Sequence, residues 1–448
     1  MTAPTNSLAR SGAQTLVTST LSVGLVFLTT VVVSRGLGPA GKGAYDLALA
    51  TGALLTTLLG FSLSAGVTYV VARGAGDTRR LARTLAPIAL VQGAVAAVVL
   101  VLVNSTALRS ALLPSALGVM VVAPIAVLVS AGILAAELRA VVIGRRRFTA
   151  ANGRDLATVV AQLSFVALAV GVPAAVHASP SPLMAVWASA LSAVLGLGLY
   201  ARAVAPERGP QIGPSGLDDA FRYSIRAHIA NVAQFVNYSA DLFFVSYFVG
   251  LSGVAFYALA VNIAQLVWLI SWAAATVVFP HVAAHETGAD EAAARSAQAA
   301  RITAGGSIGA ALVLGIAANL VIRIIFGAQF EPAVSAVYWL LPGIVALAVG
   351  RVVASYFAGI GRPDINATLS ILGLIVTLPL DLLFIPTFGI NGAAIASSVS
   401  YIATAAGTLA LFCRRTGIPI GSVVLPTLAD ATAMAVMIQS LRPPGLGS

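Results

Sequence analysis

The chain has 448 residues, of which 59% are apolar and only 9% are charged. Soluble domains carry roughly 25% charged residues, so this composition excludes a soluble globular protein and predicts a polytopic membrane protein. The net charge of +10 does not indicate nucleic-acid binding, because the basic residues sit in short loops between apolar runs. The single cysteine, Cys413, excludes an internal disulfide and a multi-cysteine metal site.

Twelve stretches are long and apolar enough to cross a membrane, since one helical span needs about 20 residues. The first stretch lacks a signal-cleavage pattern, so we expect it to be retained as a helix. The predicted spans lie near residues 8–34, 43–72, 84–104, 115–138, 150–177, 183–204, 223–249, 253–282, 300–325, 332–358, 364–385 and 390–413. The sequence thus predicts an all-α fold with about twelve transmembrane helices.

A sharp connection joins the first two spans, and a degenerate copy of it occurs 212 residues later. The first copy reads Ser34-Arg-Gly-Leu-Gly-Pro-Ala-Gly-Lys-Gly-Ala-Tyr45, in which proline fixes φ and the glycines permit close backbone approach. The second copy, Val249-Gly-Leu-Ser-Gly-Val-Ala-Phe-Tyr-Ala-Leu-Ala260, aligns Tyr257 with Tyr45. The same hairpin used twice in the same sense predicts two six-helix lobes related by a parallel repeat.

A Pro/Gly-rich segment divides the two predicted lobes. We expect an N-terminal lobe over residues 1–204, a cytoplasmic linker over 205–219 and a C-terminal lobe over 220–413. Residues 414–448 are predicted to form a cytoplasmic tail, in which 423–438 has the composition of an interfacial helix.

The arginine distribution predicts the orientation of the chain in a cell membrane. With the N-terminus inside, the outer connections hold only Arg35, Lys42, Arg109 and Arg323, and nearly all other basic residues lie at inner loops and helix ends. The positive-inside rule therefore places both termini in the cytoplasm.

Several motifs of small residues occur along the chain in an order that is typical of one transporter family. They are Ser34–Tyr45 above, Asp241 with the following Gly-x-x-Gly-x-x-x-Tyr, Phe326-Gly-Ala-Gln-Phe-Glu-Pro332, Leu341-Pro-Gly343, Gly359-Ile-Gly-Arg-Pro363 and Ile385-Pro-Thr-Phe-Gly-Ile-Asn-Gly-Ala-Ala394. In this order, over residues 1–413, the chain resembles the polysaccharide (O-antigen, Wzx-type) flippases of the multidrug/oligosaccharidyl-lipid/polysaccharide exporter superfamily.

The resemblance implies two six-helix lobes that move undecaprenyl-diphosphate-linked oligosaccharide to the outer leaflet by alternating access. It implies a transporter and no enzyme, with membrane lipid and the lipid-linked sugar as ligands. Polysaccharide-assembly proteins are candidate partners, and H⁺ or Na⁺ is a candidate coupling ion. The residues indicate no nucleic-acid partner, catalytic residue, cofactor or metal, and no phosphate-binding Gly-x-x-x-x-Gly-Lys-Ser/Thr loop occurs.

The seventh predicted span carries most of the candidate substrate-binding residues. At ~100° per residue its polar groups fall within about a third of the helix circumference, and such a face is costly unless it lines water or protein. Cavity lining and hydrogen bonding between helices both remain open. The candidates are Asn231, Gln234, Asn237, Tyr238 and Asp241, with Arg226 near the same face.

Charged groups inside or near other spans are weighed separately. Arg351 lies within the tenth span, where it either binds substrate or extends to the membrane surface. We expect Arg226 and Arg351 to hold a diphosphate, and Asp241 to be a candidate ion-coupling site. Glu137 and Asp381 lie near the ends of their spans, where we expect interfacial rather than cavity groups.

Three alternatives stay open beside this interpretation. An ion-coupled multidrug exporter of the same superfamily would use carboxylates for cationic drugs, whereas few acids lie within these spans. The lipid II flippases are another relative, but they usually carry two further helices. A membrane glycosyltransferase, ligase or polymerase would need long loops with catalytic side chains, and the loops here are short.

Overall fold

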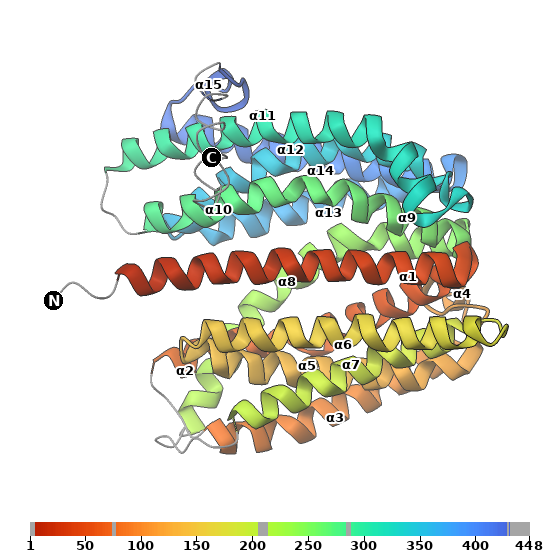
Figure 1. Ribbon diagram of the computed structural model, residues 1–448. Helices are drawn as coiled ribbons and strands as arrows, with labels where there is room; N and C mark the ends of the chain where they lie inside the picture. Colours follow the sequence, from red (N-terminus) through yellow and green to blue (C-terminus); the bar gives the residue numbers. More distant parts are fainter. Residues whose placement is uncertain (1–4, 74–77, 205–213, 284–287, 428–429, 431–448) are drawn as a thin grey trace, which may run out of the picture. The chain divides into compact units, whose positions relative to one another are not determined.

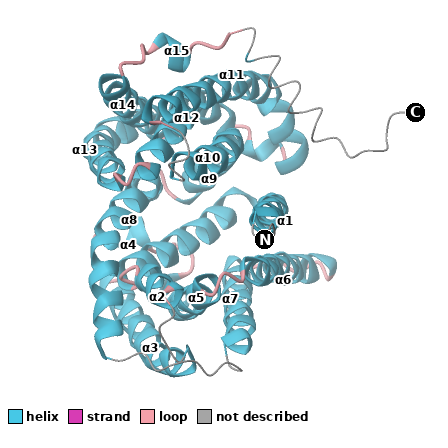
Figure 2. Cartoon of the chain, turned by 90° about the vertical axis from the view of Figure 1, so that its left-hand side faces the viewer, coloured by secondary structure: helices cyan, strands magenta, loops and turns pink. Residues whose placement is uncertain are grey.

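The computed structural model describes residues 5–73, 78–204, 214–283, 288–427 and 430. Within these ranges all regular structure is helical and there is no strand (Figure 2). Ten helices of this part are long and apolar enough to cross a membrane. One of them, the kinked α1 (Thr5–Leu59), covers two predicted spans, and the more polar α8 (Pro214–Phe248) is not among the ten. The prediction of an all-α polytopic membrane protein is confirmed.

Contacts divide the chain into two compact units. The first is Met1–Phe256 with Ile325–Gln329, and the second is Tyr257–Ile324 with Phe330–Ser448. The α8 helix packs against α2 (Leu63–Ala72) in the first unit. Residues 205–213 lie outside the described part, so the predicted linker and the lobe boundary beside it stay predictions.

The first unit is a bundle in which α5 is flanked by α3 and α7, while α6 packs on α1 and α7 (Figure 1). Its interior is built around side chains such as Ile125, Val129 and Ala48, none of which is exposed. Its remaining helices are α3 (Thr78–Val103), α4 (Arg109–Leu112), the short helix η1 (Gly118–Val121), α5 (Val122–Gly144), α6 (Phe148–Ala175) and α7 (Pro182–Val204); α9 (Leu251–Ala264) begins in this unit.

The predicted sharp connection between the first two spans is a kink at a single residue. The backbone is non-helical at Gly38, with φ 66° and ψ −178°, and the helix continues directly on both sides. Gly43 then meets the start of α9, where a Cβ would lie 1.7 Å from the Leu251 carbonyl oxygen. Only a residue without a side chain permits this approach, which is how small residues bring membrane helices together.

A break that the sequence did not predict interrupts the second span between α1 and α2. Phe61 and Ser62 both have positive φ, 49° and 51°, a conformation that a bulky side chain rarely adopts. The Gln92 amide of α3 donates a hydrogen bond of 2.6 Å to the Leu59 carbonyl. This bond satisfies one of the carbonyls that the end of α1 leaves without a partner inside the helix.

The second unit has α12 packed against α10, α11 and α14, with α13 beside α14 (Figure 1). Its helices are η2 (Gln265–Val267), α10 (Trp268–Ala283), α11 (Ala289–Val321), α12 (Ala333–Gly359), α13 (Pro363–Phe388), α14 (Ile390–Thr416) and α15 (Gly421–Val424). The π-helical turn η3 (Ile322–Phe326) and the short helix η4 (Ala328–Phe330) each lie partly in the first unit.

Each unit contains, within its described residues, a buried tyrosine–serine hydrogen bond. Tyr45 of α1 bonds Ser189 of α7 at 2.9 Å, and Tyr257 of α9 bonds Ser397 of α14 at 3.0 Å. Each pair joins the second predicted span of its half of the sequence to the sixth. The two tyrosines are also the ones that align in the sequence repeat, so the parallel repeat is present in the side-chain contacts as well.

An ion pair holds the chain after α14 against α11. Arg301 donates to both carboxylate oxygens of Asp430, at 2.5 and 3.0 Å, and also to the Ser422 carbonyl at 3.0 Å. The hydrogen bonds from Arg301, together with those from Thr427, hold the pKa of Asp430 well below its usual range. Most of the predicted interfacial stretch 423–438 lies outside the described residues.

Candidate functional site

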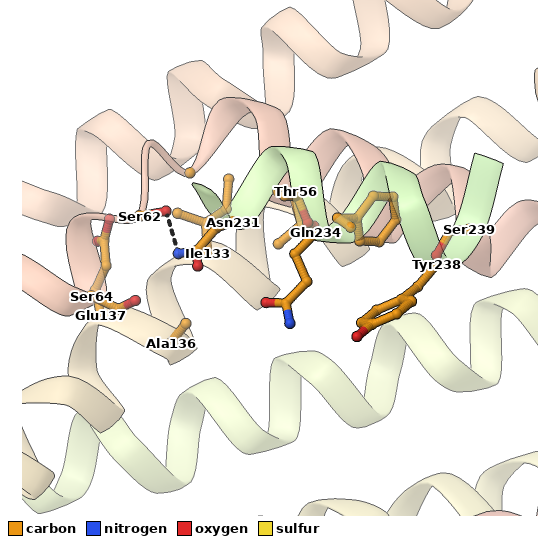
Figure 3. A pocket seen from close by; sticks show the side chains of 13 residues that line it. Thr56, Ser62, Ser64, Ile133, Ala136, Glu137, Asn231, Gln234, Tyr238 and Ser239 are labelled. Carbon is orange, nitrogen blue, oxygen red and sulfur yellow. Dashed lines mark hydrogen bonds between the residues drawn. The ribbon is translucent and has the colours of Figure 1, made fainter. Parts of the chain in front are cut away.

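The first unit contains a polar cavity of ≈ 490 Å³ at the break between α1 and α2 (Figure 3). Gln234 and Tyr238 project into it from α8, and Glu137 of α5 lies at its Ser64 end. None of the described lining residues is a lysine or an arginine. The polar lining consists of Thr56, Thr57, Ser62, Ser64, Asn231, Gln234, Tyr238, Ser239 and Glu137.

Helix α8 holds the break that shapes this cavity. The Asn231 amide donates to the Ser62 hydroxyl at 3.0 Å, and the same hydroxyl lies 3.4 Å from His228 Nδ1. The His228 ring also packs on Phe61, with ring centroids 5.4 Å apart. Contacts from one turn of α8 therefore fix Phe61 and Ser62, the two residues of the break that have positive φ.

A second hollow lies beside the first and is apolar. It measures ≈ 650 Å³ and is lined by parts of α2, α3 and α8, including Val67, Ile88 and Phe221. The break contributes Phe61 and Leu63 to this groove, and Gly60, Ser62 and Ser64 to the polar cavity. Five consecutive residues thus alternate between a polar and an apolar compartment, which lie on opposite sides of one short segment.

The structure divides the polar face that the sequence predicted on α8. Asn231, Gln234 and Tyr238 line the cavity (Figure 3). Asn237 and Asp241 are instead buried, with 4% and 3% of their surface exposed, and Asp241 accepts a hydrogen bond from the Leu242 backbone N–H. At ~100° per residue these two fall at one edge of the predicted arc and Asn231 at the other, so a single helix face meets two different surroundings.

The structure does not show in one site the two arginines that we expect to bind a diphosphate. Arg226 belongs to α8, but its side chain lies outside the described part. Arg351 belongs to α12 in the second unit, where its guanidinium stacks 3.7 Å from the centre of the Trp268 ring. The Trp268 indole N–H is itself bound to the Ile344 carbonyl at 3.2 Å, which fixes this cation–π contact.

Two acids expected at the membrane interface are buried instead. Glu137 is 2% exposed and faces the polar cavity, and Asp381 on α13 is fully buried. The expectation failed because distance along a helix gives depth from the span end, whereas burial depends on which helices pack around that end. The signal that could have identified Glu137 is its position as the one acid in the apolar run Val122–Gly144.

Comparison with known proteins identifies the family. The family model of the lipid II flippase MurJ matches residues 47–443. No protein with a curated description matches this chain. Among solved structures, "Lipid II flippase MurJ, inward closed conformation" superposes with a TM-score of 0.75 at 13% identity, covering 96% of this chain and 93% of that one.

Multidrug transporters of the same superfamily share the fold. An inward-facing multidrug resistance MATE transporter superposes with a TM-score of 0.70 at 18% identity, covering 88% of this chain and 94% of that one. An outward-facing structure of such a transporter superposes with a TM-score of 0.62 at 17% identity, covering 91% of this chain and 95% of that one. At these identities the likeness shows the fold alone.

The resemblance to Wzx-type polysaccharide flippases is therefore wrong at the level of the family, although the superfamily is right. The small-residue motifs permit tight connections and close helix approach, as at Gly38 and Gly43, and such packing residues do not identify a substrate. The match over residues 47–443 does separate them, and it makes the protein a lipid flippase and not an enzyme. The chain belongs to the lipid II flippase MurJ family.

Proposed function

We propose that this protein moves lipid II, the lipid-linked precursor of peptidoglycan, from the inner to the outer leaflet of the cytoplasmic membrane by alternating access. The observation that carries the proposal is the family match over residues 47–443. The predicted orientation, with both termini in the cytoplasm, is part of the proposal.

The paired hollows of the first unit suit an amphipathic substrate. A sugar or peptide headgroup needs hydrogen-bonding partners, which the amides and hydroxyls of the polar cavity supply. An isoprenoid tail needs apolar surface, which the neighbouring groove supplies. Because Gly60–Ser64 borders both, a molecule lying across this segment would place its two parts in matching surroundings.

Other residues receive proposed roles from their chemistry. Asn231, Gln234 and Tyr238 contact the headgroup, and Asn237 supports this face from its buried edge. Arg226 and Arg351 hold the diphosphate, for which a planar guanidinium offers two parallel hydrogen bonds. Asp241 is the proposed ion-coupling group, with H⁺ or Na⁺ as the ion.

Replacing Gln234 by alanine is expected to weaken lipid II binding about two- to tenfold, since one hydrogen bond contributes about 0.5–1.5 kcal/mol. The measurement is native mass spectrometry of the purified full chain titrated with lipid II. Gln298→Ala is the matched control, because Gln298 is an exposed amide on α11 outside the cavity.

The same titration with other ligands tests the proposal against its rivals. Undecaprenyl diphosphate that carries a sugar but no peptide should bind more weakly than lipid II. A chain that bound a cationic drug and showed no affinity for lipid II would be a multidrug exporter, and the proposal would fail.

A further inference from the structure

Glu137 is a buried acid for which the described part of the chain supplies no counter-charge. Both of its carboxylate oxygens are buried without a hydrogen-bond partner, and the residue is 2% exposed. An ionised carboxylate in such a place is strongly unfavourable unless it is paired or hydrogen-bonded. A partner that the described residues do not supply must therefore neutralise it whenever the cavity excludes water.

Two other acids of the first unit show what a structural carboxylate looks like in this protein. Asp46 is ion-paired with Lys42. Asp155 accepts a hydrogen bond of 2.8 Å from Arg139 and another of 2.5 Å from Tyr200. Where the fold uses a carboxylate to join helices, it provides the partner, and at Glu137 it provides a cavity instead.

The titratable groups around Glu137 do not replace that partner. Tyr238 lines the same cavity from α8, and His228 contacts the lining only through Ser62. On α2, Arg73 stacks over the Tyr69 ring at 4.5 Å. Among the described cations on the other helices packed against α5, Lys42 on α1 is paired with Asp46, Arg154 on α6 donates to the Leu199 and Ala150 carbonyls, and Arg83 on α3 and Arg202 on α7 lie exposed. Arg139 of α5 itself is paired with Asp155 on α6.

We propose that Glu137 is an exchangeable binding site for a single monovalent cation within the first unit. The smallest such cation is a proton, which converts the carboxylate to a neutral acid without a second ligand. A sodium ion or a primary ammonium group carries the same charge, and hydroxyl and amide oxygens of the cavity lining would complete its shell. Cation binding at Glu137 does not require the lipid substrate. Only the coupling of this binding to transport rests on the proposed function.

The test is infrared difference spectroscopy of the full chain in lipid nanodiscs, comparing wild type with Glu137→Gln. The amide keeps the volume of the acid and removes its titration. We expect wild type to show a protonated-carboxyl band at neutral pH that the variant lacks. Glu291→Gln is the control, since Glu291 is an exposed acid paired with Arg295 on α11, and it should keep the band.

Adding sodium chloride or methylammonium chloride to the same samples distinguishes the possible cations. If a metal ion or an ammonium group occupies the site, its addition changes the carboxylate bands of wild type and leaves Glu137→Gln unchanged. A site that responds only to pH binds a proton. Identical spectra for wild type and Glu137→Gln under all three conditions would overturn the proposal, whatever lipid the protein carries.

A second variant keeps the test informative if the Glu137→Gln protein does not fold. Glu137→Asp retains the acid on a side chain one methylene shorter, so it should shift the same band rather than remove it. An aspartate variant whose spectrum matches wild type would also count against the site.

Discussion

Replacing Lys42 by alanine is expected to lower the free energy of unfolding by about 3–5 kcal/mol, the usual cost of removing one member of a buried ion pair. Lys42 is fully buried in α1, and Asp46, one turn further along the helix, is its partner. The variant leaves Asp46 as an uncompensated charge in a low-dielectric interior. Denaturant unfolding of the purified protein, monitored by tryptophan fluorescence, measures the change.

The double variant Lys42→Met with Asp46→Leu is the control that isolates the charge. Apolar side chains of similar volume often replace a buried pair without loss of stability, so the double variant should be more stable than either single one. If Lys42→Ala unfolds at the same denaturant concentration as wild type, the pair is not a structural contact.

Gly43→Ala is expected to destabilise the first unit by about 1–3 kcal/mol or more, the range for overpacking a filled interior. The added Cβ would lie 1.7 Å from the Leu251 carbonyl oxygen and 2.5 Å from its carbon, and backbone atoms cannot turn aside as a flexible side chain can. Either α1 or the start of α9 must move. Thermal melting of the purified variant measures the loss.

Gly52→Ala is the matched control on the same helix. A Cβ at Gly52 meets nothing closer than 3.8 Å, at Ile125, which is ordinary contact. Alanine is favoured over glycine within a helix by roughly 0.5–1 kcal/mol, so this variant should be unchanged or slightly more stable. Equal melting temperatures for the two variants would show that Gly43 does not set the approach of α9.

Most of the fold could be predicted from the sequence, because membrane spans have a strong sequence signal. The length and hydropathy of each run located the helices, and the repeat of Tyr45 at Tyr257 indicated two similar halves. The break at Phe61 and Ser62 was missed because it depends on partners distant in sequence, namely Gln92 and Asn231. No proline marks it, and the glycine directly before it, Gly60, is one of the chain's 42 glycines.

The candidate site could be predicted only in part, because it also depends on residues that are distant in sequence. Helical periodicity groups the polar residues of α8 within one arc, and three of them line the cavity. It could not show that Asp241 at the edge of that arc meets protein, or that Glu137 of another helix faces the same space. Angle and depth along one helix are local properties, whereas a cavity is formed by several helices together.

The most direct test of the proposed flippase function is a leaflet assay with the purified full chain in proteoliposomes. Fluorescent lipid II in the inner leaflet is protected from an impermeant reductant until it is moved outward. The account predicts that vesicles with the protein lose this protection far faster than protein-free vesicles. Protection that decays at the protein-free rate under every applied pH and sodium gradient would contradict it.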